Sequence, residues 1–502
     1  MIEVAPILAI IIPLMGSFLT PLISILTKRY KKERIRDLFV VAITIVTLLL
    51  VLHMLPTVWS GNIIVYRLGN WTPPWGICLA IDGLNILVAL IVSGIAALVS
   101  IYSLMYMKKD TGLGKYYTLL LLILASMMGV TLTGDFFNLF VFFEIMSVSA
   151  YALVAFRRNW DSIEASIKYM VIGSLGASLV LLGISFTYSL VGSLNIADIA
   201  QKISIIGTNP LPPVLILILA LMMTGFCIKI AMVPFHAWMP DAYQAAPSAV
   251  VALFAACTTT VGVYVMLRIV YTLFGVAALG VMLIVLGSVT MVVGALMALV
   301  QRNLKRLLAY SCISQVGYIL LGVGFGTALG IEGGLFHLLN NAIYKALLFM
   351  CAGAILYRVG TCNLDELGGL SKNMPVTASL FTIGALAISG VPPFNGFASK
   401  WTIYIAGIQA GKAFFTLLAI IVSVLTLAYL LKAINAIFLG QRPKRFENIR
   451  EAPMTMLFPM MLLAVLCIVL GVLPSLGIDI VTPAYNSLTN QYGYIHAVLG
   501  GI

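Results

Sequence analysis

The stretch GFCIKIAMVPFHAW, residues 225–238, decides the fold, because it places a lysine inside an apolar run that Pro234 then breaks. The rest of the chain is equally apolar: 62% of its 502 residues are hydrophobic and 9% are charged, whereas about a quarter are charged in a soluble domain. Apolar stretches long enough to cross a bilayer core of about 30 Å recur along the whole sequence. The sequence therefore predicts an all-α, polytopic membrane protein with Lys229 inside one of its spans.

Fourteen membrane spans are predicted from these stretches, and the seventh and twelfth are interrupted by proline or glycine. The predicted spans are 4–26, 37–58, 80–107, 116–133, 136–156, 165–191, 211–233, 248–273, 276–300, 305–327, 332–357, 375–408, 412–439 and 454–477. No basic segment precedes the first span and no small-residue cleavage site ends it, so we expect a mature helix there and not a signal peptide.

The lysines and arginines predict how these spans are oriented. Twenty of the 29 fall in loops on one side of the membrane, whereas Arg67, Lys202 and Lys412 fall in loops on the other. Positive residues favour the cytoplasmic side, so both termini of this multi-pass protein are expected outside the cytoplasm, in the cell (inner or plasma) membrane. The net charge of +12 reports this bias and does not suggest a nucleic-acid partner.

No cofactor or metal site is expected in the chain. No predicted loop exceeds about 22 residues, which leaves no soluble domain to hold redox centres. The seven cysteines occur singly, without a C-x-x-C pair, which is typical of buried, inert thiols. The chain itself is therefore not expected to transfer electrons.

Charged residues within the spans carry the functional signal. Six basic residues lie there: Lys168, Lys229, Arg268, Lys345, Lys400 and Lys432. Lys168 lies one turn from Glu164, and Arg268 and Lys432 lie near span ends, where a side chain can snorkel to the interface. The other three lie deeper, where a charge costs at least about 2.5–3.5 kcal/mol and faces a partner or water.

Glu144, in FNLFVFFEIMSVSAY, is the only carboxylate deep in a span, and we expect it to pair with Lys229. The pair has two interpretations: a static ion pair that joins two helices, or part of a proton or ion path. A buried ion pair is a poor source of stability, so the presence of several such groups favours the path.

Two histidines extend this pattern. His236 follows the Pro234 break, and His337 lies in GLFHLLNNAIYKALLF, eight residues before Lys345 and therefore on the same helix face. Histidine titrates near neutral pH and suits a proton relay, although a single intramembrane histidine is equally compatible with a hydrogen-bonded packing residue.

The two interrupted spans occupy matching places. MVPFHAWMP breaks the seventh span after Lys229, and ISGVPPFNGFASKW breaks the twelfth before Lys400, five spans later. Broken helices in corresponding positions of two halves are typical of inverted repeats with an ion site near the midplane. Irregular backbone at that depth needs neighbouring protein or water, so Lys229 is predicted to lie on a hydrated path.

Four motifs give the sequence a family resemblance. GDFFNLFVFFEIMSVSAYAL, KIAMVPFHAWMPDAYQAAPSA, NLKRLLAYSCISQVGY and ISGVPPFNGFASKW resemble the antiporter-like subunits of respiratory complex I, of Mrp cation/proton antiporters and of group 4 membrane-bound nickel–iron hydrogenases. WTPPWGICLAIDGLN and the chain length are most similar to the D-type Mrp subunit and its hydrogenase counterpart. The resemblance implies about fourteen transmembrane helices, with helices 4–8 and 9–13 as two inverted five-helix repeats.

This resemblance also implies an organisation of the chain. A three-helix segment at 1–110 would precede the first repeat at 115–273 and the second at 276–440, and a C-terminal helix and tail would occupy 454–502.

The resemblance further implies roles for individual residues. Glu144 matches the glutamate of the fifth helix and Lys229 the lysine of the broken seventh, while His337 and Lys345 match positions that link two half-channels, and Lys400 matches the residue near the outlet. The chain departs from the family at Thr260, where a lysine is usual. A threonine cannot carry a proton charge, so His236 or water would have to bridge that step, or else this subunit relays protons poorly.

Three classes of function are compatible with the sequence. We favour an ion-translocating subunit that works with other antiporter-like and small hydrophobic membrane subunits, over an independent secondary transporter or a structural anchor. Such a subunit moves H⁺ and is driven by a redox module of the hydrogenase or complex I kind, or it serves an Mrp Na⁺/H⁺ antiporter without redox chemistry. PFHAW favours the redox complexes slightly, whereas GDFFNLFVFFEIMSVSAY favours the antiporter.

Overall fold

The computed structural model describes residues 2–30, 33–207, 211–274, 279–441 and 443–500. Within these residues it has twelve helices long and apolar enough to cross a membrane, and two shorter apolar helices, Pro213–Lys229 and Pro375–Ser389. The shorter helices are the first parts of the seventh and twelfth spans, so the fourteen predicted spans are confirmed. The predicted start of the ninth span and of the second repeat, residue 276, lies outside the described residues.

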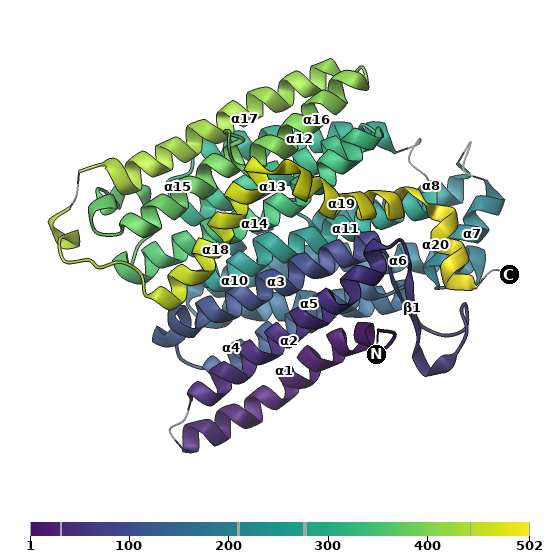
Figure 1. The fold of residues 1–502 in the computed structure, drawn as a ribbon, viewed down its shortest axis with the longest axis horizontal. Coiled ribbons are helices and arrows are strands. Elements are labelled where there is room, and N and C mark those ends of the chain that lie inside the picture. The colour runs from purple at the N-terminus through teal and green to yellow at the C-terminus, as the bar shows by residue number, and fades with distance from the viewer. Residues whose placement is uncertain (1, 31–32, 208–210, 275–278, 442, 501–502) are drawn as a thin grey trace.

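The spans pack into one bundle, in which α1 and α2 lie along one edge and α16 and α17 along the opposite edge (Figure 1). The unbroken spans are α1 (Ala5–Arg29), α2 (Arg34–Trp59), α3 (Gly83–Tyr106), α4 (Leu113–Leu132), α5 (Phe136–Val154), α6 (Trp160–Val191), α12 (Gly280–Leu299), α13 (Leu304–Gly324), α14 (Ala328–Val359), α17 (Ala413–Ile434) and α18 (Met454–Val472). The eighth span is a continuous series of α10 (Ser248–Leu253), η4 (Phe254–Thr258), α11 (Thr259–Arg268) and η5 (Ile269–Phe274).

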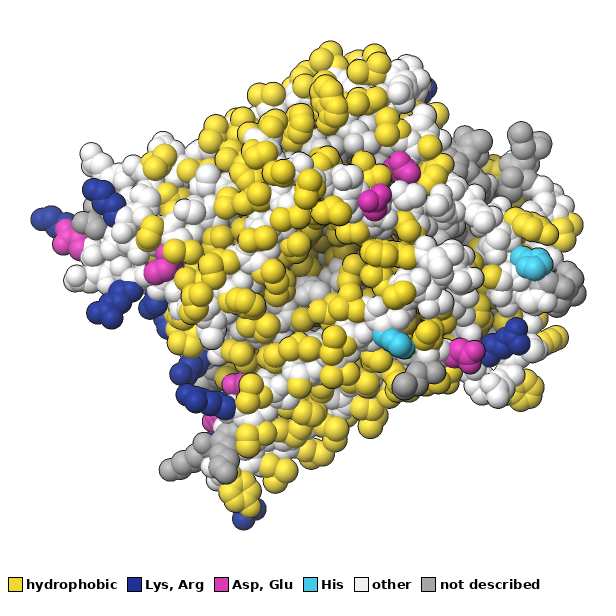
Figure 2. Space-filling view, viewed as in Figure 1, with side chains coloured by type: hydrophobic (Ala, Val, Ile, Leu, Met, Phe, Trp, Pro, Cys, Tyr) yellow, Lys and Arg dark blue, Asp and Glu magenta, His cyan; other side chains and the backbone are white. Residues whose placement is uncertain are grey.

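The surface is divided as expected for a membrane protein. Figure 2 shows hydrophobic side chains over the broad middle of the visible face, with lysines and arginines gathered at one end, near the connections from α1 to α2 and from α17 to α18. The first and last helices start and finish toward the opposite end (Figure 1). The chain therefore has one basic end, and both termini lie away from it.

Two short β-bridges mark corresponding places in the two halves of the chain. Asp135 pairs with Asn195 before α5, and Asn303 pairs with Asn363 before α13, so that each bridge joins residues sixty positions apart. The helix that follows in each half, α6 or α14, is 32 residues long. The order of spans from α4 to η5 is thus repeated from α12 to α17, as the sequence resemblance implies.

Both broken spans turn at a proline. In the seventh span, α8 (Pro213–Lys229) is followed by a turn with a cis bond between Val233 and Pro234, and then by α9 (Trp238–Ala245). In the twelfth, α15 (Pro375–Ser389) is followed by a turn with a cis bond between Pro392 and Pro393, and then by α16 (Asn395–Gln409). The second turn needs glycine, because a Cβ at Gly396 would lie 1.8 Å from the carbonyl oxygen of Ala387.

The two breaks have the same hydrogen-bond arrangement with different donors. In the first, the indole N–H of Trp238 on α9 donates to the carbonyl of Ile228 at the end of α8, at 3.0 Å. In the second, the Nζ of Lys400 on α16 donates to the carbonyl of Ile388 at the end of α15, at 2.9 Å. Lys229 precedes its break and Lys400 follows the other, yet both amino groups lie beside the end of the first half-helix.

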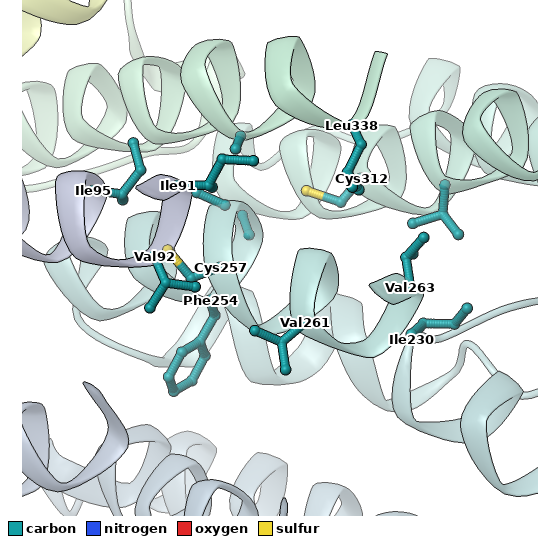
Figure 3. Close-up of a cluster of buried hydrophobic side chains, with 14 of the residues drawn as sticks. Ile91, Val92, Ile95, Ile230, Phe254, Cys257, Val261, Val263, Cys312 and Leu338 are labelled. Atoms are coloured by element: carbon teal, nitrogen blue, oxygen red, sulfur yellow. The ribbon is translucent and has the colours of Figure 1, made fainter. Parts of the chain in front are cut away.

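The eighth span forms the centre of the hydrophobic core. Every residue of α11 is buried, and Figure 3 shows Val261 and Val263 among apolar side chains that include Ile91 of α3, Cys312 of α13 and Leu338 of α14. Two π-helical turns, η4 and η5, flank α11 and leave the span unbroken. Position 260 therefore lies in a tightly packed, apolar part of the molecule.

Several elements were not predicted from the sequence. A hairpin of β1 (Ile64–Arg67) and β2 (Cys78–Ile81) fills the connection before α3. The third span accordingly starts at Gly83 and not at 80, because Asp82 accepts hydrogen bonds from the first turn of α3. Three further helices were also missed: α7 (Ile196–Ile206), α19 (Pro474–Thr489) and α20 (Gln491–Leu499).

Candidate functional site

Glu144 on α5 and Lys229 at the end of α8 form the predicted pair. Their Oε1 and Nζ atoms are 3.3 Å apart, and Nζ also donates to the Ser147 hydroxyl at 2.7 Å and lies 5.2 Å from the centre of the Phe143 ring. The lysine side chain is 5% exposed and the glutamate side chain 34%. Lys229 is thus fixed inside the chain, whereas Glu144 lies at its edge.

This geometry allows the carboxylate to leave while the ammonium stays. Lys229 keeps the serine hydroxyl and the aromatic ring as partners when Glu144 turns away, and both interactions stabilise a cation. Since Glu144 is partly exposed, its movement requires no rearrangement of the core. The arrangement is therefore better suited to a switch than to a static clasp.

A second group of polar side chains lies between α13 and α14. Lys345 is buried, and its Nζ donates to the Ser311 hydroxyl at 2.5 Å and to the Leu308 carbonyl at 3.5 Å. No carboxylate of the described residues lies within 4 Å of this ammonium. A buried cation held by a hydroxyl and a carbonyl gives up a proton more readily than one held by a carboxylate.

His337 connects this group to the broken twelfth span. Its Nδ1 and the Ser399 hydroxyl are 2.9 Å apart, and its Nε2 and Gln315 Oε1 are 3.1 Å apart. Ser399 precedes Lys400, whose Nζ also donates to the Ser423 hydroxyl at 3.0 Å and lies 4.5 Å from the centre of a tyrosine ring. Lys345, His337 and Lys400 therefore form a row of buried groups connected by polar side chains.

The structure places Thr260 and His236 outside this row. The Thr260 hydroxyl is buried and donates to the Ala256 carbonyl of its own helix at 2.6 Å. The His236 ring is partly buried, with its centre 6.4 Å from that of Tyr310, and its Nδ1 has no hydrogen-bond partner among the described residues. Neither side chain joins Lys229 to Lys345 by a direct hydrogen bond.

The expectation that Arg268 snorkels to the interface is wrong. Arg268 is 2% exposed, and its Nη1 lies 2.7 Å from Oδ2 of Asp82, while its Nη2 donates to Asn85 at 2.6 Å. The ring of Tyr494 on α20 covers the guanidinium at 4.9 Å. This pair is a buried connection between α3, α11 and the C-terminal helix, and sequence spacing could not show it, because 186 positions separate its two members.

The other two expectations for basic residues near span ends agree with the structure. Lys168 pairs with Glu164 at 2.8 Å, and also with Asp241 at 3.1 Å. Lys432 is exposed and donates to the carbonyls of Leu299 and Gln301, at the end of α12.

Lys305 was missed, because the sequence analysis counted it among the loop charges. It is 3% exposed, and its Nζ donates to the carbonyls of Gln244, at 2.8 Å, and Ala246. It also lines a polar cavity of about 430 Å³ with Lys168, Asp241 and Arg306. Its place beside the N-cap residue Asn303 disguised it as an interfacial residue.

Comparison with known proteins identifies the family. Residues 133–426 match the family described as "NADH:quinone oxidoreductase/Mrp antiporter, TM", and residues 68–117 match "NADH-Ubiquinone oxidoreductase (complex I), chain 5 N-terminus". The chain belongs to the antiporter-like subunits of these complexes.

Two curated relatives of this antiporter-like subunit cover nearly its whole length. It is 37% identical to the N-type subunit of the NADH-quinone oxidoreductase of Desulforudis audaxviator, over 93% of the chain and 95% of the relative. It is 32% identical to the D-type subunit of the Na⁺/H⁺ antiporter of Bacillus subtilis, over 98% and 99%. Both relatives are subunits of larger membrane assemblies, so the chain is a subunit of that kind.

Two solved structures have the same fold as this subunit. One is in the Mrp complex of Dietzia sp. DQ12-45-1b, with a TM-score of 0.90, 27% identity and 99% of each chain covered. The other is in the membrane-bound sulfane sulfur reductase, described as an archaeal respiratory membrane complex, with a TM-score of 0.90, 35% identity and coverage of 99% and 100%. Antiporter and redox assemblies are thus represented equally well.

The cysteines of the antiporter-like subunit are all free and buried, as predicted. Within the described ranges, no three His, Cys, Asp or Glu side chains gather in a way that could hold a metal ion.

Proposed function

We propose that the chain moves protons across the membrane along Glu144, Lys229, Lys345, His337 and Lys400. The observation that carries the proposal is the contrast between the fixed Lys229 and the partly exposed Glu144. The connected row on α13, α14 and α16 supplies the remaining proton carriers. The units 115–273 and 276–440 are taken as the two repeats, one contributing the pair and the other the row.

The switch works through the electrostatics of one ion pair. When Glu144 is near, its carboxylate stabilises the protonated form of Lys229. When it turns away, the ammonium loses its only negative partner and a proton moves toward the second repeat. Lys345, His337 and Lys400 then pass it on toward the far side of the membrane. A conformational or electrostatic signal from a neighbouring subunit moves the carboxylate.

Replacing Glu144 by glutamine is expected to lower proton transport at least tenfold, because the amide cannot change the charge state of Lys229. The measurement is the initial rate of proton uptake by inverted membrane vesicles that contain the whole complex. Glu164→Gln is the matched control, because Glu164 also pairs with a lysine, at 2.8 Å, but at the exposed start of α6. Unchanged transport by Glu144→Gln would contradict the switch.

We also propose that the basic end faces the cytoplasm and that both termini lie outside it. Single cysteines introduced at Lys412 and at Lys444, which the sequence assigns to opposite sides, test this orientation in intact cells. A membrane-impermeant maleimide is expected to label position 412 and not 444. The reverse pattern would invert the proposed topology and, with it, the direction of transport.

For the parent assembly we favour a redox-driven pump of the hydrogenase or complex I kind, with the D-type subunit of an Mrp Na⁺/H⁺ antiporter as the alternative. Gentle extraction from native membranes, followed by identification of the co-purified subunits and assays for nickel and iron, separates the two. Iron–sulfur partners are expected for the pump. Small hydrophobic partners without metal would establish the antiporter, and a chain extracted alone would contradict both.

A further inference from the structure

Lys305, the second residue of α13, is a buried cation without an acidic partner. Its side chain is 3% exposed, and its ammonium donates to the carbonyls of Gln244 and Ala246, at the C-terminal end of α9. No carboxylate of the described part of the chain lies within 4 Å of it. Two carbonyls at the negative end of a short helix compensate only partly for removing an ammonium from water, so the position is costly if its role is packing alone.

A polar cavity of about 430 Å³ lies on one side of Lys305. The loops that follow α5, α9, α12 and α14 surround it, and its charged lining includes Lys168, Asp241 and Arg306. Asp241 bridges the two basic side chains, at 3.1 Å from Lys168 and 2.5 Å from Arg306. We call this space the loop cavity. It opens at the basic end of the molecule and brings titratable groups to the edge of the core.

Lys345 lies on the other side of Lys305, deeper in the bundle. The Leu308 carbonyl, one turn further along α13, accepts from Lys345, and the Ser311 hydroxyl lies 2.5 Å from its Nζ. Six residues of helix separate Lys305 from Ser311, which is about 9 Å along the axis. Lys305 therefore lies between the loop cavity and the first carrier of the row in the second repeat.

The route from Lys229 through the eighth span offers no comparable carrier. Thr260 is buried, its hydroxyl donates to its own helix, and the side chains around it are apolar (Figure 3). Of the two approaches to Lys345, only the one along α13 carries a titratable side chain among the described residues.

We propose that Lys305 is a second proton entry, which takes protons from the loop cavity and delivers them to Lys345 without passing position 260. The ammonium of Lys305 gives its proton to the neutral amine of Lys345, across a hydrogen-bonded path that ends at Ser311. The amine left behind still has N–H groups for both carbonyls and takes a new proton from the loop cavity. This inference rests on the proposed proton transport and names a route within it.

Lys305→Arg and Lys305→Met test the entry in the whole complex. Arginine preserves the charge and the donors to both carbonyls but does not release its proton, so we expect both variants to lower the initial rate of proton uptake at least tenfold. Blue native gels establish that the complex assembles. A Lys305→Arg variant with wild-type transport would overturn the inference, because it would show that the ammonium only holds α9 in place.

Lys432 provides the matched control, since it also donates to two carbonyls at a helix end but is exposed. Lys432→Arg and Lys432→Met are expected to leave transport unchanged. Lys229→Ala, assayed in parallel, separates the two proposals. If it is inactive while Lys305→Arg is active, only the second entry fails; if it is active, the proposed function itself fails.

Discussion

Proton uptake by inverted membrane vesicles is expected to fall to background when Lys229 is replaced by alanine. Alanine removes the only cation that Glu144 contacts, and it leaves the Ser147 hydroxyl without its ammonium partner. The carboxylate can still move, but no proton then responds to its movement. The loss should be larger than that of Glu144→Gln, which keeps a proton carrier at the site.

Assembly of the Lys229→Ala complex should be normal, because Lys229 ends α8 and the Trp238 indole still holds the end of that helix. Lys229→Arg separates charge from proton transfer. Arginine retains a cation beside Glu144 yet does not release a proton at physiological pH, so it is expected to be as inactive as alanine. An active arginine variant would reduce the pair to the static clasp that the sequence left open.

Replacing Arg268 by methionine is expected to destabilise the folded chain by about 3–5 kcal/mol, the usual effect of leaving one member of a buried ion pair alone. Asp82 would keep its hydrogen bonds to the backbone of Leu84 and Asn85 but would lose its cation. The midpoint of thermal unfolding in detergent, followed by size-exclusion chromatography after heating, should fall by several degrees.

Two comparisons make this result specific to the buried pair. Arg302→Met removes an ion pair whose side chains are 80% and 59% exposed, and the loss should stay below about 1 kcal/mol. Arg268→Met combined with Asp82→Asn removes both charges and should recover part of the stability. An Arg268→Met chain as stable as the wild type would show that the Asp82–Arg268 contact has no role in holding α3 against α11.

The sequence predicted the elements whose signal is continuous along the chain. Apolar length gave the spans, proline and glycine gave the two breaks, and the single deep carboxylate identified Glu144 as the partner of Lys229. The roles carried over from the family placed His337 and Lys400 within one region, and the structure brings them together through Ser399.

Contacts between distant segments could not be predicted in this way. Arg268 looked interfacial because its partner, Asp82, lies in another span, and Lys305 looked like a loop charge because only the folded end of α9 buries it. The equivalence of Trp238 and Lys400 was hidden for a similar reason, since it is defined by the carbonyl each one contacts and not by residue type.

That equivalence bears on where the machine can exert force. A deprotonated Lys400 still has N–H groups, so it can keep its contact with Ile388 and discharge without mechanical effect, just as the neutral Trp238 holds the other break. Discharge of Lys229 is different, because it ends an attraction to a movable carboxylate at the edge of the chain. Only one of the two broken helices can therefore act as a lever between chemical energy and displacement, while the other serves as a passive valve.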